Sequence, residues 1–199
     1  MTTRRNIIKQ AALSTSLLFL PPGLGFGPGL ARADQKILDR TPACHDAPEP
    51  TPSTFEGPYF SPQSPERTDI TENRNAGTPF VVGGYVLQQD CTPVPDALIE
   101  IWQADDQGRY DNRGYYLRGH QKTDQSGRWT FATIMPGLYP GRSRHIHFKV
   151  QGPDTDVLTT QIFFPGDARN DDDYQFDARL LVTLDNSKSP LTGRFDFVL

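Results

Sequence analysis

The sequence predicts an all-β protein, an antiparallel β-sandwich preceded by an extended N-terminal arm. Two observations favour this class. The 199 residues include 17 glycines, 18 prolines, 12 phenylalanines and 7 tyrosines, a composition rich in turn formers and in side chains that suit strands. Short apolar runs also alternate with turn signals along most of the chain. Many short strands separated by turns are typical of a sandwich rather than of a helical bundle.

Seven runs of β-branched and aromatic residues are expected to form the strands. They cover residues 80–87, 97–102, 128–134, 145–150, 159–164, 180–184 and 194–199. Turn signals lie between them, among them Asp124-Gln125-Ser126-Gly127, Pro136-Gly137 and Pro165-Gly166-Asp167. The sandwich core is therefore expected over residues 79–199, without a long amphipathic helix or an internal repeat.

Two segments precede this core. Residues 34–78 show little periodicity and are rich in proline, threonine and serine, so we expect an extended arm that lies over the sandwich, with a turn at Glu56-Gly57-Pro58-Tyr59-Phe60. Residues 1–33 begin with Arg4-Arg5, continue with an apolar stretch and end in Ala31-Arg32-Ala33, whose small residues suit a signal peptidase. This order predicts a twin-arginine-type export signal and a periplasmic location. A basic N-terminus without a targeting role is the alternative.

The overall composition excludes several classes of protein. The net charge of −4 argues against a general nucleic-acid binder. No apolar stretch reaches the roughly 20 residues of a membrane span, so we expect no membrane association after signal cleavage. Two cysteines are too few for a disulfide scaffold or a four-cysteine zinc site. In an oxidising compartment Cys44 and Cys91 could form one disulfide, and two unpaired thiols are the alternative.

Two of the four histidines lie in the run His145-Ile146-His147. In a strand, side chains two positions apart point to the same face, so the two imidazoles would lie together while Ile146 faces the core. Imidazoles at this spacing are placed to chelate a metal. Two solvated surface histidines are the alternative, and the pair alone does not decide between them.

Two tyrosines next to expected strands favour the metal site. Tyr139 lies in Pro136-Gly137-Leu138-Tyr139-Pro140, just before the histidine strand, and Tyr110 lies in Gly108-Arg109-Tyr110, after another strand. A phenol with a pKa of about 10 is a poor zinc ligand but a good ligand for the hard ferric ion. Either tyrosine alone is more often a packing residue. Together with the histidines, they could hold Fe(III).

With these residues on one chain, the sequence resembles the intradiol ring-cleavage dioxygenases, the family of catechol 1,2-dioxygenase and protocatechuate 3,4-dioxygenase. The resemblance extends from about residue 56 to residue 167 and includes Glu56-Gly57-Pro58-Tyr59 and Arg142-Ser143-Arg144-His145-Ile146-His147. It implies a non-haem Fe(III) enzyme that cleaves a catechol-type ring between its two hydroxylated carbons with O₂, giving a muconate-type dicarboxylate. It also implies long active-site loops on the sandwich.

The resemblance implies roles for individual residues. Tyr110 and His145 match equatorial iron ligands of the family. Tyr139 and His147 match axial ligands, and Tyr139 would also act as a base toward the substrate hydroxyls. Arg142 would orient the ring and stabilise its negative charge. The residues that the resemblance assigns to substrate binding are Pro58, Tyr59, Arg142 and Gln161, the last of which would hold Arg142 or the substrate.

This chain departs from the family pattern in two ways. The family commonly has Pro-Ala where this chain has Ser143-Arg144, and the extra arginine could alter the pocket or point into solvent. Arg144 or Arg118 could supply the cation that a carboxylated substrate needs, and catechol, hydroxyquinol and chlorinated rings also stay open. The helical dimerisation region of the catechol 1,2-dioxygenases is not expected, so the size is nearer to one protocatechuate 3,4-dioxygenase subunit. A homo- or hetero-oligomer stays open.

Two other functions compete with this interpretation. Residues 123–139 also look like the repeated motif of transthyretin-like sandwiches, in which Phe131 fills the core and Tyr139 closes the fold. Such a non-catalytic binding module would leave Tyr110 and the paired histidines without a role. A zinc hydrolase would need a third protein ligand, and none lies in an evident motif. The run Asp171-Asp172-Asp173 is expected to be a solvated loop.

Overall fold

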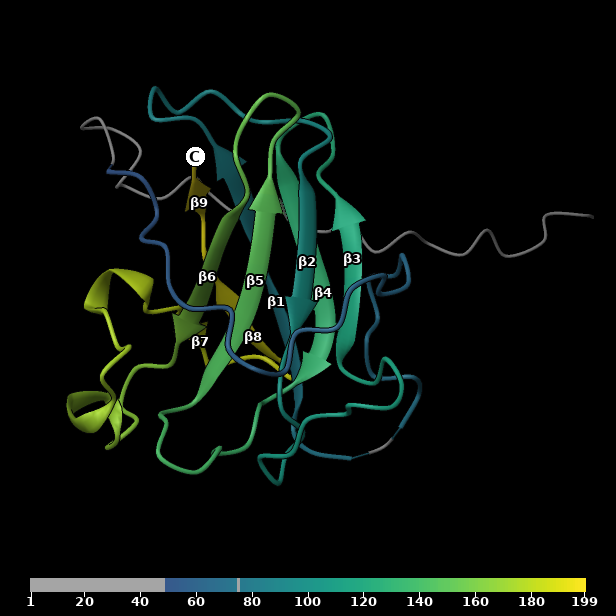
Figure 1. Cartoon of the computed structure of the whole chain (residues 1–199), viewed down its shortest axis with the longest axis vertical. Coiled ribbons are helices and arrows are strands. Elements are labelled where there is room, and N and C mark those ends of the chain that lie inside the picture. The colour runs from purple at the N-terminus through teal and green to yellow at the C-terminus, as the bar shows by residue number, and fades with distance from the viewer. Residues whose placement is uncertain (1–48, 75) are drawn as a thin grey trace, which may run out of the picture. The chain divides into compact units, whose positions relative to one another are not determined.

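The computed structural model describes residues 49–74 and 76–199, which fold into two layers of β-strands (Figure 1). The described strands are β1 (Pro79–Leu87), β2 (Leu98–Trp102), β3 (Arg118–Lys122), β4 (Arg128–Ile134), β5 (His145–Gln151), β6 (Leu158–Phe163), β7 (Thr183–Asp185), β8 (Leu191–Arg194) and β9 (Phe197–Val198). One sheet has the order β4-β1-β8-β7, with β9 paired to β1, and the other has the order β3-β2-β5-β6. The predicted all-β sandwich is confirmed.

The strand predictions differ from the structure in three places. The predicted run 194–199 covers only the last residue of β8 and the separate strand β9. β3 is absent from the predicted strands, because its sequence Arg-Gly-His-Gln-Lys has no apolar alternation. It is held as a strand by antiparallel pairing with β2. In the predicted run 180–184, the 3₁₀-helix η3 (Ala178–Leu180) precedes β7, which begins at Thr183. The side chain of Asp177 caps η3 by accepting a hydrogen bond from the backbone N–H of Arg179.

The sheets are mainly antiparallel, with one exception around β1. This strand pairs antiparallel with β4 but parallel with both β8 and β9. Apolar alternation shows which residues face inward but carries no information on strand direction. The predicted antiparallel arrangement holds for the other strand pairs and does not extend to these two pairings.

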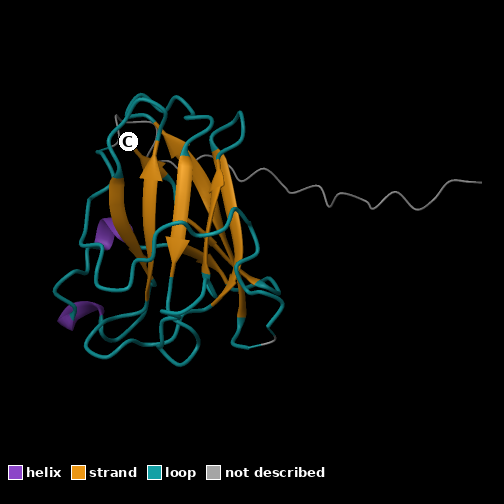
Figure 2. Ribbon diagram, turned by 45° about the vertical axis from the view of Figure 1, so that its right-hand side comes forward, coloured by secondary structure: helices purple, strands orange, loops and turns teal. Residues whose placement is uncertain are grey.

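The hydrophobic core lies between the two sheets (Figure 2). Ile99 and Ile101 of β2 and Ile146, Phe148 and Val150 of β5 are all fully buried there. These residues alternate along their strands, as the period of two requires for one face of a sheet. The same alternation directs His145 and His147 to the opposite, outer face.

The arm over residues 49–78 covers this outer face (Figure 1). It contributes no named strand within its described residues and instead makes backbone hydrogen bonds to the sandwich. The N–H of Thr51 donates to Val198 O at 2.9 Å, that of Thr54 donates to Thr159 O at 2.8 Å, and that of Ile70 donates to Ala132 O at 3.0 Å. Ile70 is fully buried in the main core and fixes the arm there.

Several sequence predictions fall outside the described residues. The export signal over 1–33, the first part of the arm and Cys44 all lie there. Cys91 is disulfide-bonded, so the alternative of a free thiol at this position is wrong. In the part of the chain that the structure describes, no helix has the length and apolar content to cross a membrane.

Candidate metal centre

A row of four side chains crosses the outer face of the β3-β2-β5-β6 sheet. Arg118, Trp102, His147 and Gln161 are paired across neighbouring strands at one register, one residue from each strand. All four are at most 4% exposed. The indole of Trp102 stacks on the imidazole of His147, with ring centres 4.8 Å apart and planes 5° from parallel. The other groups of the site lie next to this buried row.

His145 lies side by side with His147 of this row. The ring centres of His145 and His147 are 4.9 Å apart, and the side chains are 5% and 4% exposed. The alternative of two solvated surface histidines is therefore wrong. His145 Nδ1 lies 2.7 Å from the backbone carbonyl of Ser143. Because a carbonyl oxygen can only accept, Nδ1 carries the proton and Nε2 of the neutral ring presents its lone pair to the site.

Two long loops bring Tyr110 and Tyr139 to the histidines. The loops approach each other closely at Gly108, which has φ +77° and where a Cβ would lie only 2.2 Å from Leu138 O. Only glycine fits this crossing without displacing backbone. The Tyr110 hydroxyl then lies 3.2 Å from His145 Nε2, and the Tyr110 ring centre is 6.0 Å from that of Tyr139 and 6.2 Å from that of His147. The structure thus places the four predicted ligands together.

Tyr59 of the arm completes the group of tyrosines. Its ring stacks on Tyr110 with centres 4.5 Å apart, and its hydroxyl lies 2.9 Å from the Tyr139 hydroxyl. This hydrogen bond raises the pKa of Tyr59 above its usual value. Gly57 lies directly over His147, since a Cβ at Gly57 would be 3.5 Å from His147 Cε1. The neighbouring Pro58 is exposed. Residues 57–59 therefore border the site.

Burial determines the protonation states of the two histidines and of Tyr110. Burial lowers the pKa of His145 to about 4 and that of His147 well below its usual value, so both rings are neutral near pH 7. Burial also raises the pKa of Tyr110, although the charges of Arg142 and Arg118 oppose this effect. In the described part of the chain, no group of three or more His, Cys, Asp or Glu side chains could hold a metal. The donor groups that lie next to the two histidines are the tyrosine hydroxyls.

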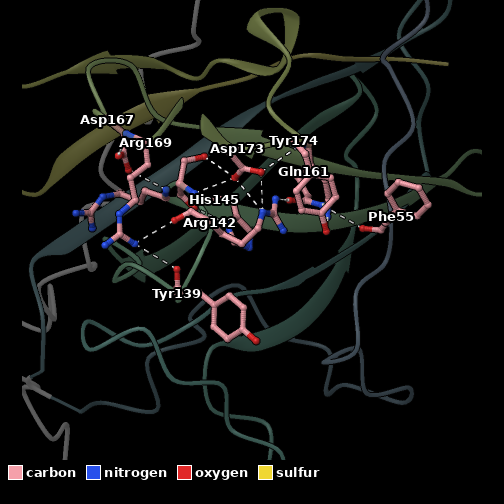
Figure 3. A network of polar contacts seen from close by, with 12 residues as sticks. Phe55, Tyr139, Arg142, His145, Gln161, Asp167, Arg169, Asp173 and Tyr174 are labelled. Carbon is pink, nitrogen blue, oxygen red and sulfur yellow. Dashed lines mark hydrogen bonds and ion pairs between the residues drawn. The ribbon is translucent and has the colours of Figure 1, made fainter. Parts of the chain in front are cut away.

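Arg142 stands beside this centre in a network of charged and polar groups (Figure 3). Its Nε donates to both carboxylate oxygens of Asp173, at 2.8 and 2.9 Å, and its Nη2 donates to Gln161 Oε1 at 2.8 Å. Gln161 Nε2 donates to the carbonyl of Phe55 at 3.1 Å and to Gln175 Oε1 at 2.7 Å. Within the described residues, Nη1 of Arg142 makes no hydrogen bond and is available to a ligand.

Asp173 is the residue of this network that sequence reasoning missed. It is 6% exposed and also accepts hydrogen bonds from the N–H and the hydroxyl of Ser143, both at 2.8 Å. Burial acts to raise its pKa, but hydrogen bonds from Gln175, Ser143 and Arg142 lower it below its usual value. The expectation of a solvated loop fails at this position, although Asp171 and Asp172 are exposed. No signal in the sequence distinguishes the third aspartate from the first two.

Arg118 and Arg144, the two arginines considered for a carboxylated substrate, both donate hydrogen bonds to backbone carbonyls. Arg118 is 1% exposed, with Nη1 donating to the carbonyl of Tyr59 at 2.6 Å and Nε donating to that of Asp111 at 3.0 Å. Arg144 Nη1 donates to the carbonyl of Pro136, so its side chain does not simply extend into solvent. Arg118 thus ties the arm to the loop that carries Tyr110.

Comparisons with known proteins identify relatives of this chain. Residues 55–199 match the family described as Dioxygenase. Catechol 1,2-dioxygenase 2 of Acinetobacter lwoffii is 30% identical over 89% of this chain and 72% of its own length. Hydroxyquinol 1,2-dioxygenase of Nocardioides simplex is 36% identical over 74% of this chain, which spans 57% of that relative. The dioxygenase domain of a dioxygenase–carbohydrate-binding fusion from Streptomyces sp. SirexAA-E superposes with a TM-score of 0.74 and 49% identity, covering 76% of this chain and 98% of that domain.

Proposed function

This chain belongs to the intradiol ring-cleavage dioxygenase family, and we propose that it cleaves a catechol-type ring between its two hydroxylated carbons with O₂ to give a muconate-type dicarboxylate. One observation carries the proposal. Two phenols and two neutral imidazoles from separate segments lie together, beside an arginine with a free N–H₂ group. A non-catalytic transthyretin-like module has no use for this arrangement, and the relatives do not favour it.

The donor set fits a ferric ion better than other common metals. Both imidazoles are neutral and the tautomer of His145 directs Nε2 toward Tyr110, so nitrogen lone pairs are available without loss of a proton. Buried Tyr110 holds its proton unless a strong, hard cation stabilises the phenolate. We propose that Tyr110, Tyr139, His145 and His147 hold Fe(III). When bound, Fe(III) would draw electron density from a catecholate and make its ring carbon reactive toward O₂.

Tyr139 can take up one of the two protons that a catechol must lose. We propose that the Tyr139 oxygen accepts a proton from one substrate hydroxyl. The Tyr59 hydroxyl, 2.9 Å away, then holds the protonated Tyr139 by a hydrogen bond. Tyr59 is half-buried. This role for Tyr59 complements its position at the border of the substrate site.

Arg142 and Gln161 position the substrate and its charge. Asp173 and Gln161 occupy Nε and Nη2 and so fix the plane of the guanidinium group. The free Nη1 is then presented at a set angle to a ring bound at the four ligands. We propose that this fixed cation stabilises the negative charge that develops on the ring. The side chain of Gln161 acts through Arg142 rather than on the ring itself.

The proposal is tested by metal content, colour and oxygen uptake. The purified chain should hold one iron atom, absorb visible light through tyrosinate-to-iron charge transfer, and consume O₂ with catechol. Tyr110→Phe should shift the absorption band and slow turnover, whereas Tyr115→Phe, which removes a hydroxyl donating to the Pro62 carbonyl, is the matched control. Arg142→Ala should lower turnover with the iron spectrum nearly intact. A colourless protein that holds zinc would contradict the proposal.

We also propose that the chain is exported to the periplasm by the twin-arginine route. Arg4-Arg5 and Ala31-Arg32-Ala33 support this, and both lie outside the described residues. Cell fractionation should find the wild type in the periplasm and the double variant Arg4→Lys/Arg5→Lys in the cytoplasm. Lys9→Arg, which preserves the arginine pair, is the control. A wild type confined to the cytoplasm would rule out export.

A further inference from the structure

Two large aromatic side chains remain exposed beside Arg142. Phe55 of the arm is 71% exposed, and Tyr174, in the loop between β6 and β7, is 79% exposed. Among the large hydrophobic side chains that the structure describes, these are the two most exposed. Isolated exposed hydrophobic residues need no explanation, but these two come from distant segments and meet at the same network.

Polar contacts tie both residues to the arginine proposed to orient the substrate. The carbonyl of Phe55 accepts a hydrogen bond from Gln161 Nε2 at 3.1 Å. The Tyr174 hydroxyl accepts one from Gln175 Nε2 at 2.8 Å, and Cζ of Arg142 lies 5.7 Å from the centre of the Tyr174 ring. Figure 3 shows Phe55 and Tyr174 at the Gln161 end of the network. The Tyr174 ring thus lies next to Arg142, and Phe55 is joined to the same network through its backbone carbonyl.

We propose that Phe55 and Tyr174 form a subsite for a second aromatic ring, so that the enzyme takes aryl-substituted catechols. This inference rests on the proposed ring cleavage and names its substrate class. Aromatic rings attract another ring by offset stacking or edge-to-face contact, and the guanidinium of Arg142 on one side of Tyr174 supports such a stack. The substituent would extend from the cleaved ring past Arg142 toward the exposed side chains of Phe55 and Tyr174, which together are called the rim.

Arg142 is the cation next to the Tyr174 ring. Asp173 neutralises Arg142, and the side chains of Arg118 and Arg144 donate to backbone carbonyls. Arg169 stands at the other end of the network, next to Asp167 (Figure 3). The free Nη1 of Arg142 is proposed to act on the negative charge of the cleaved ring, and an aryl substituent would have the two exposed aromatic side chains as its contacts.

Oxygen uptake with two substrates, catechol and a phenyl-substituted catechol, tests the proposal on the iron-loaded full chain. In the wild type the phenyl-substituted catechol should have a KM about tenfold lower than catechol, as expected for two aromatic contacts. The double variant Phe55→Ala/Tyr174→Ala should lose this preference, so that the ratio of the two KM values approaches one. Tyr174→Phe keeps the ring and should keep the preference. Val157→Ala, an exposed residue on the loop at the opposite end of β5 and β6, is the control and should leave both KM values unchanged.

Binding of monophenols separates this inference from the proposed reaction. Titration calorimetry should show that para-phenylphenol binds with a Kd about tenfold lower than phenol, with the difference lost in the double variant. If neither catechol is cleaved but this difference is found, the proposed reaction fails and the subsite stands. If catechol is cleaved and the double variant keeps the preference, the subsite is overturned and the reaction stands. A double variant that changes the sedimentation of the chain would also overturn it, because the rim would then be an interface between copies.

Discussion

The two faces of the β3-β2-β5-β6 sheet are both buried, but by different means. The inner face presents Ile101, Ile146 and Phe148 to the other sheet, and apolar contact alone accounts for its burial. The outer face presents Trp102, His147 and Gln161 to the arm and the tyrosine loops, and most of its partners are polar. The inner face needs complementary shape. The outer face depends in addition on hydrogen bonds and ring contacts between particular side chains.

The polar contacts of the outer face indicate that the candidate site lies on this side of the sheet. Within the described residues, the outer face retains buried polar atoms without a hydrogen-bond partner, among them His147 Nδ1, Trp102 Nε1 and Arg118 Nη2. Such atoms are costly in a purely structural core. Trp129 Nε1 in the core also has no partner, so it is the position of the outer-face atoms beside the four proposed metal ligands that sets this face apart.

The largest effect is expected from Phe148→Ala on the inner face. Removing a fully buried phenyl ring leaves a cavity and should lower the free energy of unfolding by about 3–5 kcal/mol. Urea unfolding followed by tryptophan fluorescence measures this. Activity per folded molecule should change much less than for Tyr110→Phe. A loss below about 1 kcal/mol would contradict the assignment of Phe148 to the core.

A somewhat smaller loss is expected from Asp173→Asn at the outer face. The variant leaves the guanidinium of Arg142 without its carboxylate in a largely buried place and should cost on the order of 3 kcal/mol. It should also lower turnover, because Arg142 is no longer held in one plane. Asp172→Asn, one position earlier and exposed, should change stability by less than about 0.5 kcal/mol. Equal effects of the two variants would show that the buried ion pair is unimportant.

Acid should destabilise the metal-free protein through the outer-face histidines. The folded chain keeps His145 neutral down to a pKa of about 4, while the unfolded chain takes up a proton near the usual 6.5. Stability should therefore be complete above pH 6.5 and fall as the pH drops toward 4, by up to about 1.4 kcal/mol per pH unit for each such histidine. Unfolding curves at several pH values measure the slope. His145→Asn should reduce the slope, and an unchanged slope would contradict the assignment of the acid effect to this histidine.

The smallest effect is expected from Gly57→Ala, where the arm crosses His147. Gly57 has φ +74°, which costs an alanine about 1 kcal/mol. The added methyl would lie 3.5 Å from His147 Cε1, an ordinary contact, so the site should keep its shape. Urea unfolding and the KM for catechol measure the two effects. A large rise in KM with unchanged stability would instead place Gly57 in direct contact with the substrate.

Most strands of the sandwich could be predicted from the sequence, because apolar alternation is a local property of each strand. The runs that became β1, β2, β4, β5 and β6 carry the pattern themselves. β3 has no such alternation and is a strand because it pairs antiparallel with the edge of β2. The direction of the β1–β8 and β1–β9 pairings likewise depends on where the chain returns in space. Asp173 shows the same limit at the site, since its partner Arg142 lies in a separate loop.

By itself, the sequence determined which residues alternate on β5, that two histidines share one face, and that two tyrosines follow turns able to reach them, because each of these is settled within a few residues. The tertiary structure alone decided that the outer face is buried, that Tyr59 stacks on Tyr110, and that Arg142 is held between Asp173 and Gln161. These contacts join segments far apart in the chain, and their free energy depends on the distance between groups rather than on their order in the sequence.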